Sequence, residues 1–552
     1  MKALESSLDK ELNTLDSLLD KTISIDALID FVRTLDFVYI ISYPDKIKWD
    51  MYMNYGFPLI LFKAYQKLDL NIDSIPLKYV EQHQIDYCFN NLKYYGQYRC
   101  VERYLQMSYL NLVAISTIDP NNHFVEVDIK TGMADRYELL KIEQFFEMMK
   151  GVVKERQKHI TQRTKRIQNQ FRKKIYLTTH KLLGYDTNPE IDKFYSDKGF
   201  IRLVTSQIYD DFDENFEFGK IPYRQHLNII EELMGVALKH IDACVYLSKK
   251  ESLNPINLFS GCFSMEEMAI SYSNYLDIPL KNVTEIFDLL TITKDNIDIY
   301  LKTDKAFSPP FIKIGNKHVM RSLKGILHHP VQFLHKSLQN KYPNEYQKGL
   351  LEREALFRDQ LYSLFQDQRI IKIDRSVRIK LKAAGIETDI DAVLFDTKTQ
   401  NLALIQLKWQ DKYSTDLKER NSKANNFYNK ANEWVEKMIR WQELTSQKQI
   451  LNALGIIDYG SFNECYIFVI GRYNTHFPEK TPDKRATWGS WYHIFDLNWR
   501  FKTDFDDPIR ELQFKLQFDS PLNKKSKIPD EEINLRTFNM KFKQKVVLYN
   551  IT

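Results

Sequence analysis

Cysteine is scarce in this sequence of 552 residues, and none of it occurs as a Cys-x-x-Cys pair. The five cysteines are scattered and odd in number, which argues against both a disulfide framework and a cysteine zinc site. Long apolar runs are also missing, since no stretch approaches the roughly eighteen residues of a membrane-spanning helix. The first residues form an acidic amphipathic segment, unlike a signal peptide. We therefore expect a cytoplasmic protein with reduced thiols and no membrane segment.

Nucleotide-binding motifs are absent too. Neither G-x-x-x-x-G-K-[S/T] nor a G-x-G-x-x-G in a strand-to-helix context occurs, so we do not expect this chain to hydrolyse ATP by itself. Any translocation along a polymer would need a protein partner such as a separate ATPase. The net charge is only +5, which does not by itself predict a nucleic-acid partner. The distribution of charge along the chain therefore has to be examined.

The chain is long enough for three or four domains, and its hydrophobic pattern changes along its length. Helical periods dominate the first part, whereas short β-rich runs follow later. A hairpin is expected at 311–320, with Gly315 and Asn316 as its two-residue turn. The expected organisation is a helical domain at 1–150, a second helical domain with a basic helix and this hairpin at 151–340, an α/β domain at 341–505 and a C-terminal arm at 506–552.

Polar side chains interrupt two apolar strands of the expected α/β domain. Segments 385–396 and 402–409 each contain a β-rich run, and the polar residues between them have the composition of a hairpin turn. Side chains alternate along a strand, so Gln406 and Lys408 project from the same side, where Asp391 of the neighbouring strand can meet them. We expect a carboxylate, an amide oxygen and an ammonium group at one end of the sheet.

This combination suits metal-dependent hydrolysis of a phosphodiester. Hard cations such as Mg²⁺ take oxygen ligands, which the Asp391 carboxylate, the Gln406 amide and the Leu407 carbonyl could supply. Lys408 could orient the attacking water or offset negative charge in the transition state. The alternative is that Asp391 caps a turn, Gln406 lies on a sheet face and Lys408 extends to solvent. Polar residues at i and i+2 of an apolar strand are costly unless something binds them, which favours a site.

An upstream helix, expected at 347–365, carries two acidic candidates for a further ligand. Its apolar stripe is formed by Leu350, Phe357, Leu361, Leu364 and Phe365. Glu354 falls within about 20° of the centre of this stripe, whereas Glu352 points nearly opposite. We therefore expect Glu354 to face the sheet and to bind the cation, its water or Lys408. The alternative is a Glu at the edge of the stripe, paired with Arg358.

A helix with Glu, a strand with Asp, a turn and a strand with Gln-x-Lys resemble the PD-(D/E)XK nuclease superfamily, which has the restriction-endonuclease-like fold. The resemblance covers roughly 345–500. It implies a mixed central sheet flanked by helices, a Mg²⁺ or Mn²⁺ cofactor, and catalysis by Asp391, Gln406, Lys408 and Glu354, with Leu407 contributing its carbonyl to the metal. Gln406 departs from the commoner Asp or Glu, and no Pro precedes Asp391. A neutral ligand lowers the negative charge of the site, which leaves weak or inactive chemistry open.

The same resemblance implies an endonuclease, with DNA expected rather than RNA, and a role in bacterial defence against phage or foreign DNA. The alternative is a helical scaffold or sensor whose nuclease-like domain binds nucleic acid or a partner without cutting. Gln406 is the feature that keeps this alternative open. An oligomer is compatible with either interpretation.

One segment, 154–174, is strongly basic and contains no Gly or Pro that would end a helix. Its apolar residues Ile160, Ile167, Phe171 and Ile175 recur at helical spacing, which leaves the other faces cationic. Such a helix could lie along a phosphate backbone, with Arg163, Lys165, Arg166 and Lys173 as the candidate contacts. The alternative is a solvated connector helix.

Two further segments combine aromatic with polar residues. The acidic and aromatic segment 209–217 could be a surface loop or a nucleic-acid mimic that covers the basic helix. His328, His329 and His335 have no supporting acids nearby in the sequence. Packing or helix capping is therefore favoured over a metal site for these histidines.

Overall fold

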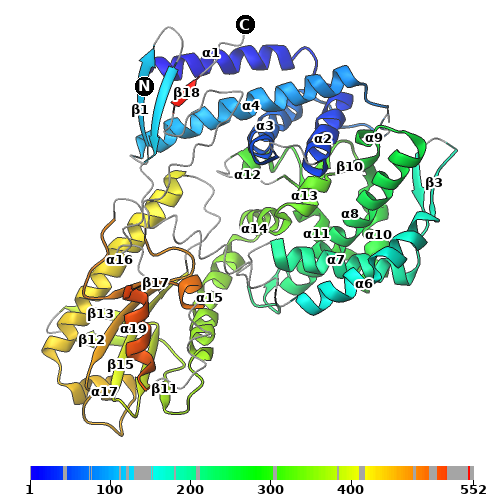
Figure 1. The fold of residues 1–552 in the computed structure, drawn as a ribbon. Coiled ribbons are helices and arrows are strands. Elements are labelled where there is room, and N and C mark those ends of the chain that lie inside the picture. The colour runs from blue at the N-terminus through cyan, green and yellow to red at the C-terminus, as the bar shows by residue number, and fades with distance from the viewer. Residues whose placement is uncertain are drawn as a thin grey trace.

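The first four helices pack side by side at the N-terminal end of the molecule (Figure 1). They are α1 (Lys2–Leu19), α2 (Ile25–Ile40), α3 (Lys46–Lys67) and α4 (Gln82–Tyr109). Helices α3 and α4 approach closely because each has a glycine at the crossing. A Cβ atom at Gly56 would lie 2.2 Å from the Leu92 carbonyl oxygen, and one at Gly96 would lie 2.1 Å from that of Tyr52.

The computed structural model describes most of residues 2–547. It leaves out 42–45, 74, 76–77, 111–112, 120–123, 130–150, 152, 180–181, 207–211, 302–307, 382–384, 410–416, 477–479, 496–505 and 519–544. The segment 139–153, whose apolar residues recur at helical spacing in the sequence, therefore lies largely outside the described residues. A small antiparallel sheet follows α4, formed by β1 (Val113–Asp119), β2 (Phe124–Ile129) and β18 (Lys545–Val547). The region 1–150 is thus not purely helical, and one strand of its sheet comes from the far end of the chain.

A second group of helices and short strands follows. It comprises α6 (Lys154–Arg172), β3 (Ile175–Leu177), β4 (Leu183–Tyr185), α7 (Pro189–Ser206), β5 (Glu217–Phe218), β6 (Ile221–Pro222), α8 (Tyr223–Glu251), α9 (Ile256–Phe259), β7 (Gly261–Ser264), α10 (Met265–Leu276), α11 (Leu280–Leu289), β8 (Thr291–Ile292), α12 (Ile297–Leu301), β9 (Phe311–Lys313), β10 (His318–Arg321), α13 (Leu323–Leu327) and α14 (Pro330–Lys341). The expected hairpin is confirmed as β9 and β10, although its connection is 314–317 rather than two residues.

The two helical groups have separate cores, but residues of the second group contribute to both of them. Side chains alternate along β9, so Ile312 packs with the first four helices while Phe311 packs with the second group. Ile292 and Met320 also join the core of the first four helices. The expected boundary at residue 150 therefore does not separate two independent cores.

The third region is built around a five-stranded mixed sheet in the order β11-β14-β15-β16-β17. Its elements are α15 (Pro343–Ser363), β11 (Ile370–Lys372), β12 (Val377–Leu381), β13 (Ile386–Ile390), β14 (Ala392–Asp396), β15 (Asn401–Lys408), α16 (Leu417–Leu444), α17 (Gln447–Leu454), β16 (Cys465–Gly471), β17 (Thr487–Ser490) and α19 (Pro508–Phe518). The expected hairpin of β14 and β15 is antiparallel, whereas β15, β16 and β17 are parallel. The apolar and aromatic composition of 490–499 is typical of a strand, but β17 ends at Ser490 and residues 491–495 are helical.

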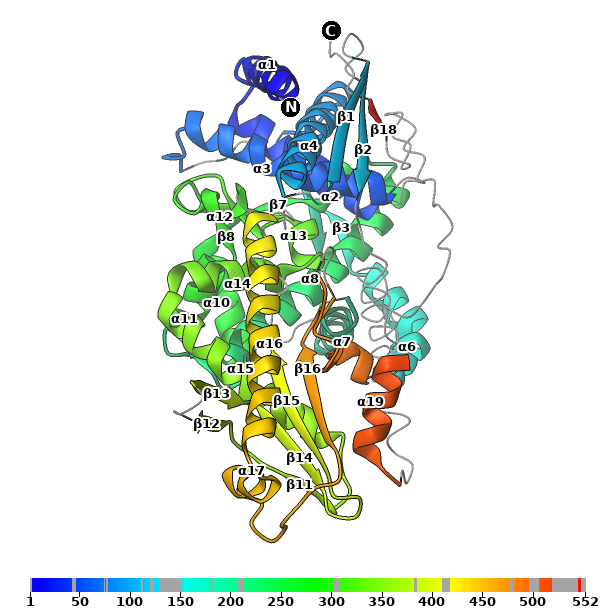
Figure 2. The same ribbon diagram turned by 90° about the vertical axis from the view of Figure 1, so that its left-hand side faces the viewer.

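Helices cover both faces of this sheet (Figure 2). Val393 and Leu404 pack on one face with α16 and α17, and Leu394 and Ile405 pack on the other with α15 and α19. Ile509, Leu512 and Leu516 of α19 are fully buried in the second layer. The expected C-terminal arm at 506–552 is therefore corrected, because its first helix belongs to the α/β region.

Candidate active site

Asp391 lies where two strands separate. It stands between β13, which pairs with β12 in a separate hairpin, and β14, which pairs with β15 as far as Ala392 and Ile405. Its own N–H still donates to the Ile405 carbonyl at 3.2 Å. Beyond that point the Asp391 side chain takes the place of a strand partner, since Leu407 N–H donates to Asp391 Oδ2 at 2.8 Å. The strand pattern thus directs a carboxylate to the end of β15.

Gln406 meets this carboxylate, as the alternation of side chains along β15 predicts. Its Nε2 donates to Asp391 Oδ2, and both residues are almost completely buried, with 2% and 4% of their surface exposed. Lys408, two residues further along, is partly exposed at the end of the strand. The Lys408 carbonyl accepts a hydrogen bond of 2.8 Å from Arg472 N–H, which fixes the backbone there.

The charges around Asp391 do not balance. Burial raises the pKa of Asp391 to about 7, the ammonium of Lys408 acts in the opposite direction, and the nearby Glu354 adds to the rise. Burial also raises the pKa of Glu354, again opposed by Lys408. Two carboxyl groups with raised pKa values thus share one lysine, which is an arrangement that a further cation would stabilise.

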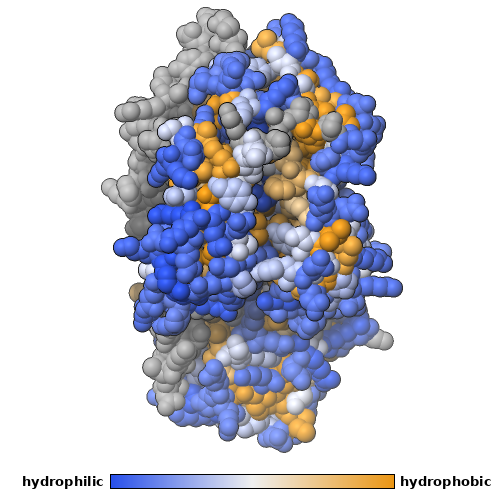
Figure 3. Space-filling view, turned by 90° about the vertical axis from the view of Figure 1, so that its right-hand side faces the viewer, coloured by the Kyte–Doolittle hydropathy of each residue, from blue (hydrophilic) through white to orange (hydrophobic). Residues whose placement is uncertain are grey.

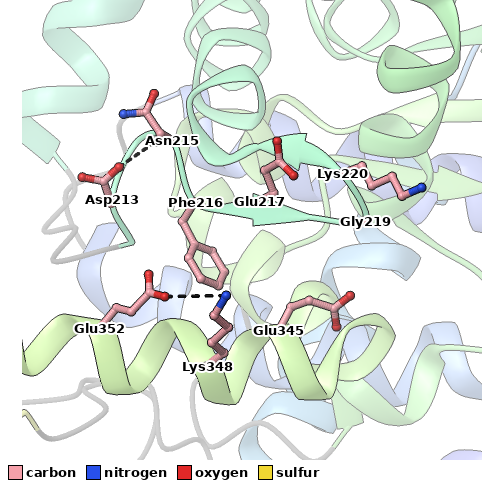
Figure 4. Close-up of a pocket in the computed structure, with 9 residues that line it drawn as sticks. All are labelled: Asp213, Asn215, Phe216, Glu217, Gly219, Lys220, Glu345, Lys348 and Glu352. Atoms are coloured by element: carbon pink, nitrogen blue, oxygen red, sulfur yellow. Dashed lines mark hydrogen bonds and ion pairs between the residues drawn. The ribbon is translucent and has the colours of Figure 1, made fainter.

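Glu354 and Glu352 point in different directions from α15, as the helical period predicts. Glu354 is half-buried and lies close enough to Lys408 and Asp391 to influence both. Glu352 is exposed, lies 3.9 Å from Lys348 and lines a hollow of about 510 Å³ beside strand β5 (Figure 4). Arg358, the alternative partner of Glu354, instead lies 4.0 Å from Asp359.

Asp389 is a neighbour of the site that the sequence reasoning missed. It is exposed on β13, and its charge raises the pKa of both Asp391 and Glu354. The Asp-Ile-Asp spacing is a signal that could have identified it, because residues two apart on a strand share a face. Asp389 therefore adds negative charge to the edge of the site.

The donor atoms at the site are oxygens, which are the kind of ligand that hard cations such as Mg²⁺ take. Among the described residues no group of three His, Cys, Asp or Glu side chains could hold a metal ion. The available donors are the carboxylates of Asp391 and Glu354, the Gln406 amide oxygen after a half-turn of the amide group, and the Leu407 carbonyl. That carbonyl points to the same side of β15 as the Leu407 N–H, hence toward Asp391.

The basic helix is confirmed as α6, with Ile160, Ile167, Phe171 and the following Ile175 buried beneath it. Its candidate contacts divide into two pairs. Arg163 and Arg166 lie 3.6 and 2.5 Å from Glu190 Oε1. Lys165 and Lys173 are exposed, and no ion pair involves them in the described part of the chain. Figure 3 shows the right-hand side of the molecule in Figure 1, where hydrophilic surface is interrupted by several hydrophobic patches.

The remaining candidates serve packing. His335 is buried, hydrogen-bonded through Nε2 to the Tyr223 hydroxyl at 2.9 Å, and its pKa is lowered by burial and by Arg353. The rings of His328 and His329 meet edge-on, with centroids 4.2 Å apart, just before α14. Of the segment 209–217, the first three residues lie outside the described part, while Phe212 packs in the core of the second helical group. This aromatic residue is therefore no surface mimic of nucleic acid.

Comparisons with known proteins leave the site to be interpreted from its chemistry. The chain shows no significant match to a protein-family model, to a curated protein sequence or to a solved structure. Across the described segments, no helix has both the length and the apolar character that a membrane span requires.

Proposed function

We propose that this protein is a metal-dependent nuclease that hydrolyses phosphodiester bonds in nucleic acid, with DNA as the expected substrate. The observation that supports it is the convergence of four residues at one end of a mixed sheet: Asp391 from the junction of β13 and β14, Gln406 and Lys408 from β15, and Glu354 from α15. We also propose that the five-stranded mixed sheet is similar to the sheet of the restriction-endonuclease-like fold.

Each residue has a role in this proposal. Asp391, Glu354, the Gln406 amide oxygen and the Leu407 carbonyl would hold Mg²⁺ or Mn²⁺, which lowers the pKa of water and offsets phosphate charge when bound. Lys408 stands at the open end of the strand, where its ammonium can orient water or stabilise the growing negative charge. Helix α6 would contact phosphates, and a separate ATPase would supply any translocation. A role in bacterial defence is part of the proposal by resemblance.

A second candidate function is binding of nucleic acid or a protein partner without cleavage. It is favoured by Gln406, which contributes no charge to the metal site, and by the lack of a third acidic ligand among the described residues. A site with two carboxylates and two neutral oxygens has less electrostatic attraction for a divalent cation than one with three carboxylates.

Plasmid cleavage decides between the two functions. The purified chain should nick or linearise supercoiled DNA in Mg²⁺ or Mn²⁺ and not in a chelator. Asp391→Ala and Lys408→Ala should each reduce the rate by at least about 10²-fold with unchanged circular dichroism, because they remove chemistry more than packing. Full activity in either variant would show that the site is wrongly assigned, and an intact wild type that never cuts would favour the binding protein.

Gln406→Glu tests the departure from the commoner acidic ligand. The extra charge should tighten Mn²⁺ binding, measured by calorimetry, and preserve or raise the cleavage rate. A variant that binds Mn²⁺ tightly but does not cut would show that the amide itself is needed.

A further inference from the structure

Helix α15 belongs to both halves of the molecule. Tyr346, near its start, packs in the core of the second helical group, and Leu350 packs against that core. Phe357 and Leu361, near its end, are fully buried against the mixed sheet. Figure 1 shows the helix running from the helical region to the α/β region. Any displacement between the two regions must therefore act on α15.

Arg353 lies at the point where α15 passes from one core to the other. Only 4% of its surface is exposed, and in the described structure its Nε and Nη2 atoms have no hydrogen-bond partner. No ion pair to Arg353 occurs among the described residues either. A buried guanidinium without a counter-charge is costly, so its neighbours must offset the loss of water.

Aromatic rings provide that offset from two sides. The guanidinium carbon lies 4.1 Å from the ring centroid of Phe212, in the helical region, and 5.6 Å from that of Trp409, which directly follows Lys408. Both distances are within the range of cation–π attraction, which strengthens where water is excluded. Arg353 thus joins a side chain of the helical core to the residue next to the candidate catalytic lysine.

Trp409 also lies close to a second arginine. Arg472 lies 4.6 Å from the Trp409 ring centroid, and its side-chain Nη1 donates to Gln360 of α15 at 2.7 Å. The ring of Phe357 meets Trp409 edge-on at 5.8 Å. Two arginines therefore contact the residue that follows β15. Arg353 is the one that also contacts the helical region, through Phe212.

We propose that Arg353 is a positioning residue of the candidate active site, which fixes Lys408 through the stack Phe212–Arg353–Trp409 and makes cleavage depend on how the helical region is seated. The inference rests on the proposed nuclease function for its kinetic consequence. Its structural consequence, an ordered end of β15, does not need that function.

Arg353→Lys is the test, because it keeps the charge and removes the planar group that stacks on both rings. Arg358→Lys on the same helix is the matched control, since Arg358 makes no contact with Trp409. Amide hydrogen exchange of the peptide 405–409 should become about tenfold faster in Arg353→Lys and stay unchanged in the control, at similar melting temperatures. Equal exchange in the two variants would overturn the proposal.

Kinetics separate positioning from binding. Arg353→Lys should lower kcat for DNA cleavage by about tenfold and leave KM unchanged, because a small misplacement of a catalytic group affects the chemical step. Phe212→Leu should have a similar effect, and the double variant should be no worse than either single one. Additive losses, or a loss in KM alone, would contradict the stack. If the wild type does not cut DNA, the nuclease function fails, while the exchange experiment still decides the role of Arg353.

Discussion

Asp36 in the helical region and Asp391 in the α/β region are both buried carboxylates, but their surroundings differ. Four groups donate to Asp36: Ser260 Oγ at 2.8 Å, Ser322 Oγ at 3.0 Å, Leu323 N at 2.9 Å and Lys324 N at 2.8 Å. Both of its oxygens are used, and two of the donors are orphan N–H groups at the start of α13. Asp36 is a structural connection between α2 and α13.

Asp391 accepts two hydrogen bonds, and both reach the same oxygen. The described residues offer no donor to its other oxygen, while Glu354 and Asp389 add negative charge nearby. A carboxylate whose acceptor capacity is filled stabilises the fold, whereas one with unused capacity can bind something else. Burial alone therefore does not distinguish a structural carboxylate from a candidate binding carboxylate. The number of hydrogen-bond donors around the two carboxylates does distinguish them.

The largest expected effect is at Asp36. Asp36→Ala should lower the free energy of unfolding by about 3 kcal/mol or more, because two backbone N–H groups and two hydroxyls lose their acceptor. Asp26→Ala on the same helix is the control and should cost less than about 1 kcal/mol, since Asp26 pairs with the exposed Lys78. Equal losses in urea unfolding would break the comparison.

Burial raises the pKa of Asp391, so its pH dependence should be opposite to that of a carboxylate whose pKa is lowered on folding. Its pKa is about 7 in the folded protein and near its ordinary value after unfolding, so the folded state holds the proton more tightly. The free energy of unfolding should therefore fall as the pH rises from about 4 to about 7, by a few kcal/mol at most. Asp391→Asn should remove this slope and be more stable than the wild type above pH 7.

Metal binding should offset the free-energy cost of ionising the buried Asp391 side chain. A cation needs the deprotonated carboxylate, so the affinity for Mn²⁺ should rise by about tenfold per pH unit up to about pH 7. Thermal unfolding with and without Mn²⁺ at a series of pH values up to pH 8 measures this change in affinity. Parallel pH profiles of the wild type and Asp391→Asn would contradict the raised pKa of Asp391.

Local patterns predicted the parts of the site that lie on single elements. The two-residue period placed Gln406 and Lys408 on one side of β15, and the helical period separated Glu354 from Glu352. The turn chemistry predicted the β14–β15 hairpin, where Asp396 accepts a hydrogen bond from Lys398 N–H. These features depend on neighbours in sequence, which a single chain reveals.

Long-range contacts could not be predicted in the same way. The cage of Arg353 and Arg472 around Trp409 joins residues more than fifty positions apart in sequence. Packing of α19 on the sheet and pairing of β18 with β2 also link distant segments, whose composition indicated only an arm. Such contacts follow from tertiary packing, which has no period in the sequence.

Glu354 and Glu352 allow a second comparison, between a partly buried and an exposed carboxylate on the same helix, α15. Glu354→Gln should reduce the cleavage rate by at least about tenfold, or about 1.4 kcal/mol of transition-state stabilisation, because Glu354 faces Lys408 and Asp391. Glu352→Gln should stay near the wild-type rate, since Glu352 is exposed beside Lys348. A larger loss at Glu352 would mean that the wrong face of the helix was assigned to the site.

The smallest expected effects are on DNA binding by the basic side chains at α6. Two of these side chains form ion pairs with Glu190, and two are exposed without an ion pair among the described residues. Lys165→Gln with Lys173→Gln should weaken DNA binding and reduce the slope of log K against log salt by about one per residue, because each phosphate contact releases counterions. Arg163→Gln with Arg166→Gln should change the slope less, since Glu190 already pairs with both arginines. The control is Lys10→Gln with Lys21→Gln, which are exposed on and just after α1, a helix that lies far from α6 (Figure 1). An unchanged slope in the Lys165 and Lys173 variant would make α6 a connector, and a change equal to that of the control would show that only net charge matters.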